Sequence, residues 1–372
     1  MTPLPDGGLL LHIGPPKSGS TAIQRALAAV RDDLATYGVH YPGPHYRMSP
    51  RAGHAVLGME PLGRSKAPME LWQQVVADVR ATDLPKVCLS DEDFARADDA
   101  AVDRIADSLG AERIHLVWVA RRIDKMLPSQ WQERLKSTVE RSYPDYLDHM
   151  LVHADRPDAV RSWHNHDVAG MVARWSRRVD PSRITVVVAD EDDRSALPRA
   201  FEALLGLPEG LLVPPAERSN RSLTLEEAEA VRTVNRVARE EGWSAREYRR
   251  IVQTGVANRL KDVAPPAGTR PIPGIPSAFL ALVHDRADAQ ASAVAGSGIQ
   301  VIGDPDLLRT RDRVHADDAP ATVDVVPLDL VANLVSGVRA GTDVLREADV
   351  RRASRAASKP GIRDVARRLR GR

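Results

Sequence analysis

A short loop near the start of the chain carries the residue types that bind a phosphate-like anion. The apolar run of residues 9–13 is followed by a segment rich in Gly, Pro, Lys, Ser and Thr, and then by a helical pattern of apolar residues. Gly14 and Gly19 allow a tight turn and close approach of the backbone. Lys17 adds a mobile cation beside two hydroxyl side chains at the helix start. This order predicts a strand, a phosphate-binding loop and a helix, whose N-terminal N–H groups favour an anion; the plainer interpretation is a turn before an amphipathic helix.

The position of the lysine distinguishes this loop from that of the nucleotide triphosphatases. Their loop reads G-x-x-x-x-G-K-[ST], with the lysine after the second glycine, whereas here Lys17 precedes Gly19. The order resembles the 5′-phosphosulfate loop, P-K-[ST]-G-[ST]-[ST], of sulfotransferases that use 3′-phosphoadenylyl sulfate (PAPS). The resemblance implies that the donor is bound by six residues: Pro16, Lys17, Ser18, Gly19, Ser20 and Thr21. It also implies that Lys17 stabilises the charge on the leaving oxygen during catalysis.

A second pair of residues is similar to the element that binds the 3′-phosphate in these enzymes. Arg121 follows the apolar strand pattern of residues 114–120, and Ser129 stands at the expected start of a helix over 129–141. An arginine can hold a phosphate through two parallel N–H bonds, and a hydroxyl at a helix start adds a third contact. The plainer interpretation is a surface arginine and a helix-capping serine.

The resemblance to bacterial members of the P-loop sulfotransferase family extends over about residues 9–222. It implies PAPS as the donor, 3′,5′-adenosine bisphosphate as the product and no metal. The segment 218–222 stands where family members place a late loop over the nucleotide, so Asn220 and Arg221 are further candidates for donor binding. The R-K-G triplet of the cytosolic animal enzymes is absent from this segment.

Sulfuryl transfer to a hydroxyl also requires a base that takes up the hydroxyl proton. The acidic run Asp91-Glu92-Asp93 follows the apolar strand pattern of residues 86–90. Mutual repulsion of three carboxylates raises at least one pKa, which suits a base, although Asp91 or Asp93 can equally cap a helix. We expect Glu92 to be the base, with Asp91 and His54 as alternatives.

Composition limits the kinds of partner. The 372 residues carry 52 basic and 51 acidic side chains, a formal net charge of +1, so no overall field favours nucleic acid. The single cysteine, Cys88, excludes an internal disulfide, and we read neither a signal peptide nor a membrane-spanning segment. These features predict a cytoplasmic protein.

Strand patterns that alternate with helical patterns predict an α/β fold. Together with the family resemblance, these patterns imply a P-loop three-layer sandwich. Its central parallel sheet is flanked by helices, and a helical extension follows at the C-terminus. We expect a sulfotransferase-like domain over 1–263, an extension over 264–320 packed on it, and a helical or partly disordered basic tail over 321–372. Ligands of such sheets lie at the carboxyl ends of the strands, where Lys17, Glu92 and Arg121 are all expected.

The expected function is therefore transfer of a sulfuryl group from PAPS to a hydroxyl of a small metabolite or glycan. A P-loop kinase or nucleotide hydrolase, and a non-catalytic nucleotide-binding relative, are the alternatives. Acceptor contacts are expected from residues 43–70 and 140–165, whose composition suits a polar or anionic acceptor. Trp163 and Trp175 are expected in the core, and the pair His149 and His153 lacks a third metal ligand. The oligomeric state is left open.

Overall fold

The computed structural model describes residues 3–43, 50–214 and 221–357, except for the side chains of residue 50 and of residues 351–357. The chain divides into two compact units. The first comprises Met1–Glu133, Arg141–Glu217 and Ile272–Ala321, and the second comprises Arg134–Glu140, Arg218–Pro271 and Thr322–Arg372. The expected boundary after residue 263 lies inside the second unit. The expected division into a domain, an extension and a tail stays a prediction.

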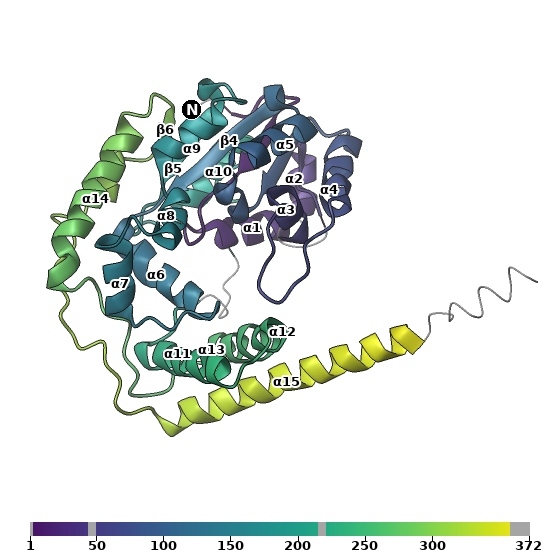
Figure 1. Cartoon of the computed structure of the whole chain (residues 1–372). Helices are drawn as coiled ribbons and strands as arrows, with labels where there is room; N and C mark the ends of the chain where they lie inside the picture. Colours follow the sequence, from purple (N-terminus) through teal and green to yellow (C-terminus); the bar gives the residue numbers. More distant parts are fainter. Residues whose placement is uncertain (1–2, 44–49, 215–220, 358–372) are drawn as a thin grey trace, which may run out of the picture. The chain divides into compact units, whose positions relative to one another are not determined.

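The first unit is built on a sheet of six parallel strands (Figure 1). The strands are β1 (Leu9–His12), β2 (Val39–His40), β3 (Lys86–Ser90), β4 (Ile114–Ala120), β5 (Ile184–Val188) and β6 (Gln300–Ile302). Their spatial order is β2-β3-β1-β4-β5-β6. The order reverses at β1, because the chain passes to β2 and β3 on one side before it crosses to β4 on the other. Ligands of parallel sheets bind at such a switch point, beyond the carboxyl ends of the strands.

Helices connect these strands. The α-helices of the first unit are α1 (Ser20–Ala29), α2 (Arg31–Thr36), α3 (Pro50–Leu57), α4 (Glu70–Ala81), α5 (Asp99–Leu109), α6 (Ile123–Leu135, whose last two residues belong to the second unit), α7 (Tyr143–Leu151), α8 (Pro157–His164), α9 (Val168–Trp175), α10 (Ala196–Leu205) and α14 (Ser277–Ala295). Short 3₁₀ helices are η1 (Glu92–Arg96), η2 (Ala111–Arg113), η3 (Pro181–Arg183) and η6 (Pro305–Leu308).

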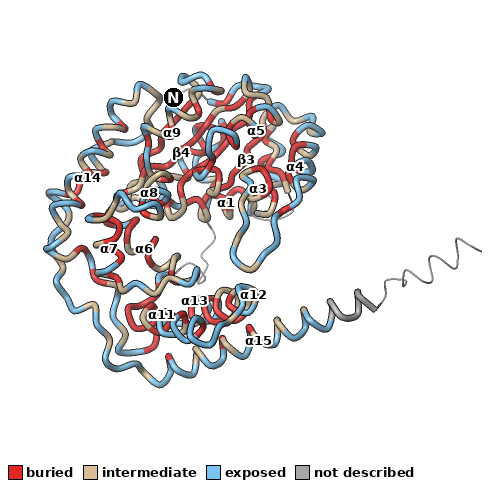
Figure 2. The backbone as a smooth tube through the Cα atoms, viewed as in Figure 1, coloured by how far each residue is buried: buried red, intermediate tan, exposed pale blue. Residues whose placement is uncertain are grey.

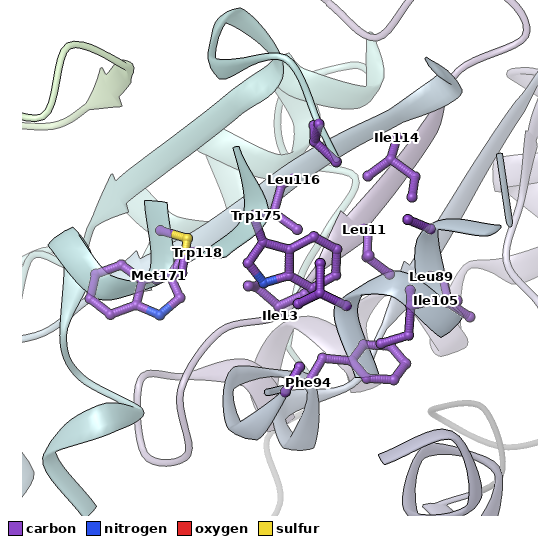
Figure 3. Close-up of a cluster of buried hydrophobic side chains, with 14 of the residues drawn as sticks. Leu11, Ile13, Leu89, Phe94, Ile105, Ile114, Leu116, Trp118, Met171 and Trp175 are labelled. Atoms are coloured by element: carbon purple, nitrogen blue, oxygen red, sulfur yellow. The ribbon is translucent and has the colours of Figure 1, made fainter. Parts of the chain in front are cut away.

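Both faces of the sheet are covered by helices, because successive strand residues point to opposite faces. Leu11 of β1 and Trp118 of β4 belong to a buried cluster that also contains side chains of α5 and α9, including Trp175 (Figure 3). Leu10 faces the other way, into a cluster with α1 and α10. The four central strands β3, β1, β4 and β5 are almost entirely buried, whereas the edge strand β6 is only partly buried (Figure 2). These three layers confirm the fold class predicted from the sequence.

Several elements differ from those expected. The helix expected over 129–141 begins at Ile123 and ends at Leu135, with Pro128 inside it. Ile123, Met126 and Leu127 are buried, and burial of this apolar face outweighs the main-chain hydrogen bond that a proline removes. Of the two tryptophans expected in the core, Trp175 is buried, whereas Trp163 is only partly buried.

The second unit is helical. It contains α11 (Leu225–Glu240), α12 (Ala245–Tyr248), the π-helix η5 (Arg249–Val256), α13 (Ala257–Asp262) and the long helix α15 (Leu328–Ala357). At the start of α11, Thr224 and Glu227 form a capping box, a pattern that local sequence alone encodes. Two glycines of α15 let it approach η5 closely, since a Cβ on Gly337 or Gly341 would lie 2.7 or 2.5 Å from a main-chain atom of η5.

Candidate functional site

The loop between β1 and α1 has the backbone geometry of an anion-binding turn. Lys17 and Gly19 have positive φ angles of 72° and 97°. Gly19 is the residue before α1, and no side chain of the described residues caps this helix start. The left-handed conformation costs a glycine little but is sparsely populated by a lysine. Left-handed residues in such a loop turn successive N–H groups toward one side, as in anion-binding nests.

The N–H groups of this loop are available to a ligand. Within the described part of the chain, the structure shows no acceptor for the main-chain N–H groups of Lys17, Gly19, Ser20 and Thr21. Ser18 is used internally, because its N–H and its hydroxyl donate to the Pro15 carbonyl at 3.3 and 2.7 Å. A helix start leaves its first N–H groups unsatisfied, and here they stand together with those of the preceding loop. The predicted loop residues are thus brought to one place.

His12, the last residue of β1, lies under this loop and was not identified from the sequence. Its fully buried imidazole places Nδ1 2.8 Å from the Ser90 hydroxyl at the end of β3, and Gln24 donates to the same hydroxyl at 3.2 Å. Nε2 of His12 has no hydrogen-bond partner among the described residues. A Cβ on Gly14 would lie 2.4 Å from this atom, so a glycine is needed there. Burial lowers the pKa of His12 to about 3, which keeps the ring neutral at pH 7.

Arg121, at the end of β4, contacts the loop directly. Its Nη1 donates to the main-chain carbonyl of Lys17 at 2.6 Å. Its Nε and Nη2 donate to the two carboxylate oxygens of Glu191, at 2.6 and 3.0 Å. The guanidinium therefore lies beside the loop, as the sequence-based hypothesis required. The neighbouring Arg122 makes a buried bidentate pair with Asp124.

Two carboxylates that the sequence analysis did not single out hold the two principal cations of the site. Glu133 of α6 lies 2.8 Å from Nζ of Lys17, and Glu191 follows β5 and holds Arg121. Glu191 was detectable from the sequence, because it follows a strand whose carboxyl end faces the same edge as the loop. Glu133 carried no such signal. A bound dianion would compete with both carboxylates for these cations.

Ser129 does not stand at a helix start. The helix begins six residues earlier, at Ile123, so Ser129 occupies its second turn and cannot cap it. The expectation of a capping hydroxyl was wrong because the start of α6 was placed after Pro128. Ser129 is partly exposed, and its role in binding stays a prediction.

The candidate bases gather beyond β3. Asp91 is fully buried and accepts from the Asp93 N–H at 2.9 Å, so it caps η1. Glu92 is the first residue of η1 and is partly buried. His54 of α3 reaches the same segment, with its Nε2 3.2 Å from a carboxylate oxygen of Asp93. The two main candidates, Glu92 and His54, are thus brought to the same strand end, and the choice between them stays a prediction.

The guanidinium of Arg221 is engaged by hydrogen bonds within the second unit. Its two terminal nitrogens donate to the carboxylate of Glu227 at 2.8 and 2.6 Å, and its remaining N–H groups donate to the carbonyls of Ser222, Leu260 and Val263. These contacts use all five donors of the guanidinium, which argues against the donor-binding role suggested for Arg221. Asn220 lies outside the described residues.

The described residues contain neither a metal site nor a membrane-spanning helix. They contain no group of three or more His, Cys, Asp or Glu side chains placed to hold a metal ion. No described helix is both long enough and apolar enough to cross a membrane.

Comparison with known proteins leaves the family open. No protein-family model matches the chain, and no curated protein matches it. Among solved structures, a sulfotransferase from Alicyclobacillus acidocaldarius matches 65% of this chain and 95% of its own, with 14% sequence identity and a TM-score of 0.41. This likeness is too low to carry a functional assignment.

Proposed function

We propose that the protein is a PAPS-dependent sulfotransferase that acts on a hydroxyl acceptor. The observation that carries the proposal is the contact between Arg121 and the Lys17 carbonyl. It puts a guanidinium suited to one phosphate beside a loop suited to another, at the switch point of the sheet. A nucleotide with anionic groups at both its 3′ and 5′ positions matches this pair of anion-binding groups.

The residues present fit such a donor. The loop has four main-chain N–H groups without an acceptor among the described residues, and Gly14 and Gly19 keep side chains out of it. Lys17 and Arg121, each paired with one carboxylate, supply two cationic side chains beside this loop. Pro16, Ser18, Ser20 and Thr21 complete the loop around this position.

The chain's own residues then perform three tasks. The loop N–H groups and Lys17 hold the 5′ end and stabilise negative charge on its oxygens. Arg121 holds the 3′-phosphate and orients the nucleotide. Glu92, or His54 in its place, accepts the proton of the acceptor hydroxyl. The donor supplies the sulfuryl group, whose bond to the phosphate oxygen breaks as the bond to the acceptor oxygen forms, leaving a sulfate ester and 3′,5′-adenosine bisphosphate.

Thermal unfolding with candidate nucleotides tests this function. At about a hundredfold excess over Kd, a ligand stabilises the folded state by about 2.7 kcal/mol. We expect 3′,5′-adenosine bisphosphate to raise Tm of the wild-type chain, and Arg121→Ala to abolish that increase. Lys125→Ala is the matched control, since it removes a half-exposed cation four residues further along the chain, in α6, and should leave the increase intact.

The alternatives predict other results. An increase in Tm with ATP and Mg²⁺ but not with the bisphosphate would indicate a kinase or nucleotide hydrolase. Binding of the bisphosphate without transfer of radiolabelled sulfate from PAPS to any of a panel of hydroxyl compounds would indicate a non-catalytic relative.

A further inference from the structure

A cavity of about 480 Å³ lies in the first unit, next to Arg121. Its walls come from α6, α8, α9 and α14 and from the segments that flank α8. This volume is within the range of sites for small organic molecules. Arg121 is part of the lining and also contacts the loop at Lys17, so the cavity adjoins the proposed donor site.

One wall of the cavity is apolar. Ile123 and Met126 of α6, Val160 of α8 and Val168 of α9 contribute to it. The lining also includes Trp163 of α8 and Arg286 of α14, whose guanidinium carbon lies 4.5 Å from the centroid of the indole ring. A cation over a tryptophan face is stabilised and held in place. The cavity therefore combines an apolar wall with one oriented guanidinium.

Arg286 has no carboxylate partner among the described residues. None of the ion pairs between described residues includes Arg286, and burial alone lowers its pKa. The other charged groups of the lining are balanced, since Arg121 is paired with Glu191 and Asp167 interacts with Arg174. His164 and His166 have lowered pKa values, about 4 for His166, so both are neutral at pH 7. The cavity consequently carries a surplus positive charge at Arg286.

Two further polar groups of the lining have unused hydrogen-bonding capacity. Nε2 of His166 and Oε1 of Gln290 are buried without a partner among the described residues. Buried polar atoms are normally satisfied by protein, water or ligand.

We propose that this cavity holds the acceptor, and that the acceptor is an organic anion. Its carboxylate, phosphate or sulfate group binds Arg286, and its apolar body lies against α6 and α8. Residues 154–164, within the range expected from the sequence to contact the acceptor, supply part of the wall. The assignment as acceptor rests on the proposed function, whereas the selection of an anion rests on the cavity alone.

A fluorescent organic anion, 8-anilinonaphthalene-1-sulfonate, tests the cavity without turnover. The full chain is titrated as wild type, as Arg286→Gln, and as Ala289→Trp, which places a large side chain in the lining from an exposed position. We expect both variants to weaken binding about tenfold, as loss of a charge-assisted contact or of the cavity volume predicts. Arg313→Gln, at an exposed arginine outside the lining, is the matched control and should bind as the wild type does. Equal affinity of the wild type and both variants would overturn the proposal.

A matched pair of competitors tests the selection of charge. We expect 4-hydroxyphenylacetate to displace the fluorescent probe from the wild type at about tenfold lower concentration than the uncharged 4-hydroxyphenylacetamide. In Arg286→Gln this difference should fall to within about twofold. Equal displacement by acid and amide from the wild type would overturn the selection of an anion.

Binding of 3′,5′-adenosine bisphosphate separates this inference from the proposed function. We expect Arg286→Gln to leave the increase in Tm with the bisphosphate unchanged. Loss of that increase in the variant would mean that the cavity holds the nucleotide and would overturn its assignment to the acceptor. Absence of the increase already in the wild type would refute the proposed function, while the titrations would still decide whether the cavity selects an organic anion.

Discussion

The guanidinium of Arg121 donates a hydrogen bond of 2.6 Å to the main-chain carbonyl of Lys17, a residue 104 positions earlier in the chain. The two residues follow adjacent strands, β4 and β1, so the register of the sheet brings them together. The contact joins the lysine-bearing loop to the arginine expected to hold a second phosphate. The carboxylates of Glu133 and Glu191 complete this arrangement by pairing with the two cations.

Glu191→Gln is expected to strengthen the binding of 3′,5′-adenosine bisphosphate. The pair of Arg121 and Glu191 is largely shielded from solvent, with side-chain exposures of 25% and 19%, so a phosphate must compete with a close carboxylate. Removing that charge should lower Kd about threefold to tenfold, measured by isothermal titration calorimetry. Asp193→Asn, at an acid after the same strand whose side chain is 40% exposed, serves as the control. A weaker affinity of Glu191→Gln would show that the carboxylate positions Arg121 instead of competing for it.

Lys17→Ala is expected to separate catalysis from product binding. The bisphosphate lacks the sulfuryl group, so loss of the lysine should weaken its binding only a few-fold. Turnover should fall at least about a hundredfold, as expected when a group that stabilises charge in the transition state is removed. The measurements are kcat with PAPS and Kd for the bisphosphate; an unchanged kcat would contradict the assigned role.

Glu92→Gln is expected to abolish turnover while leaving the increase in Tm with the bisphosphate intact. The amide keeps the shape of the side chain but cannot accept the acceptor proton. His54→Gln is the parallel variant, because His54 reaches the adjacent Asp93. Normal turnover of Glu92→Gln together with loss in His54→Gln would transfer the role of the base to the histidine.

Gly14→Ala is expected to destabilise the fold by about 1–3 kcal/mol, because its Cβ would meet Nε2 of His12 at 2.4 Å. Removal of the opposing ring should relieve the clash. The double variant with His12→Ala should therefore be less destabilised than the sum of the two single variants, as measured by urea unfolding. Additive effects would show that the loop absorbs the extra methyl group in another way.

Stability is expected to decrease as pH falls below about 6.5. The unfolded chain protonates its histidines near this pH, whereas burial holds the pKa of His12 at about 3 and that of His166 at about 4. Between pH 6.5 and the folded-state pKa of each histidine, the unfolded state binds one proton more than the folded state. Each histidine therefore lowers the free energy of unfolding by about 1.4 kcal/mol per pH unit as the pH falls. Urea unfolding at pH 7, 6 and 5 measures this slope. His12→Asn should reduce the slope by about 1.4 kcal/mol per pH unit. An unchanged slope in His12→Asn would contradict the burial of a neutral ring.

Local residue patterns were enough to predict several elements of this protein. The glycines, Lys17 and the hydroxyl residues predict a phosphate-binding type of loop from a few consecutive residues. The apolar runs of β3 and β4 have the bounds that the sequence predicted, and the capping box at Thr224 is equally local. Errors occurred where a local signal competed with burial. Pro128 obscured the start of α6 and so misplaced Ser129, and Trp163 lies at a cavity instead of in the core.

The partners of the site residues were decided by the tertiary structure alone. Glu133 and Glu191 reach Lys17 and Arg121, His12 reaches Ser90, and Arg286 reaches Trp163 across separations that range from tens of residues to more than a hundred. Such contacts depend on strand register and helix packing, which sum weak interactions over the whole unit. No single residue or short pattern encodes them. The sequence therefore determined which residue types the loop presents, and the fold determined which charges surround it.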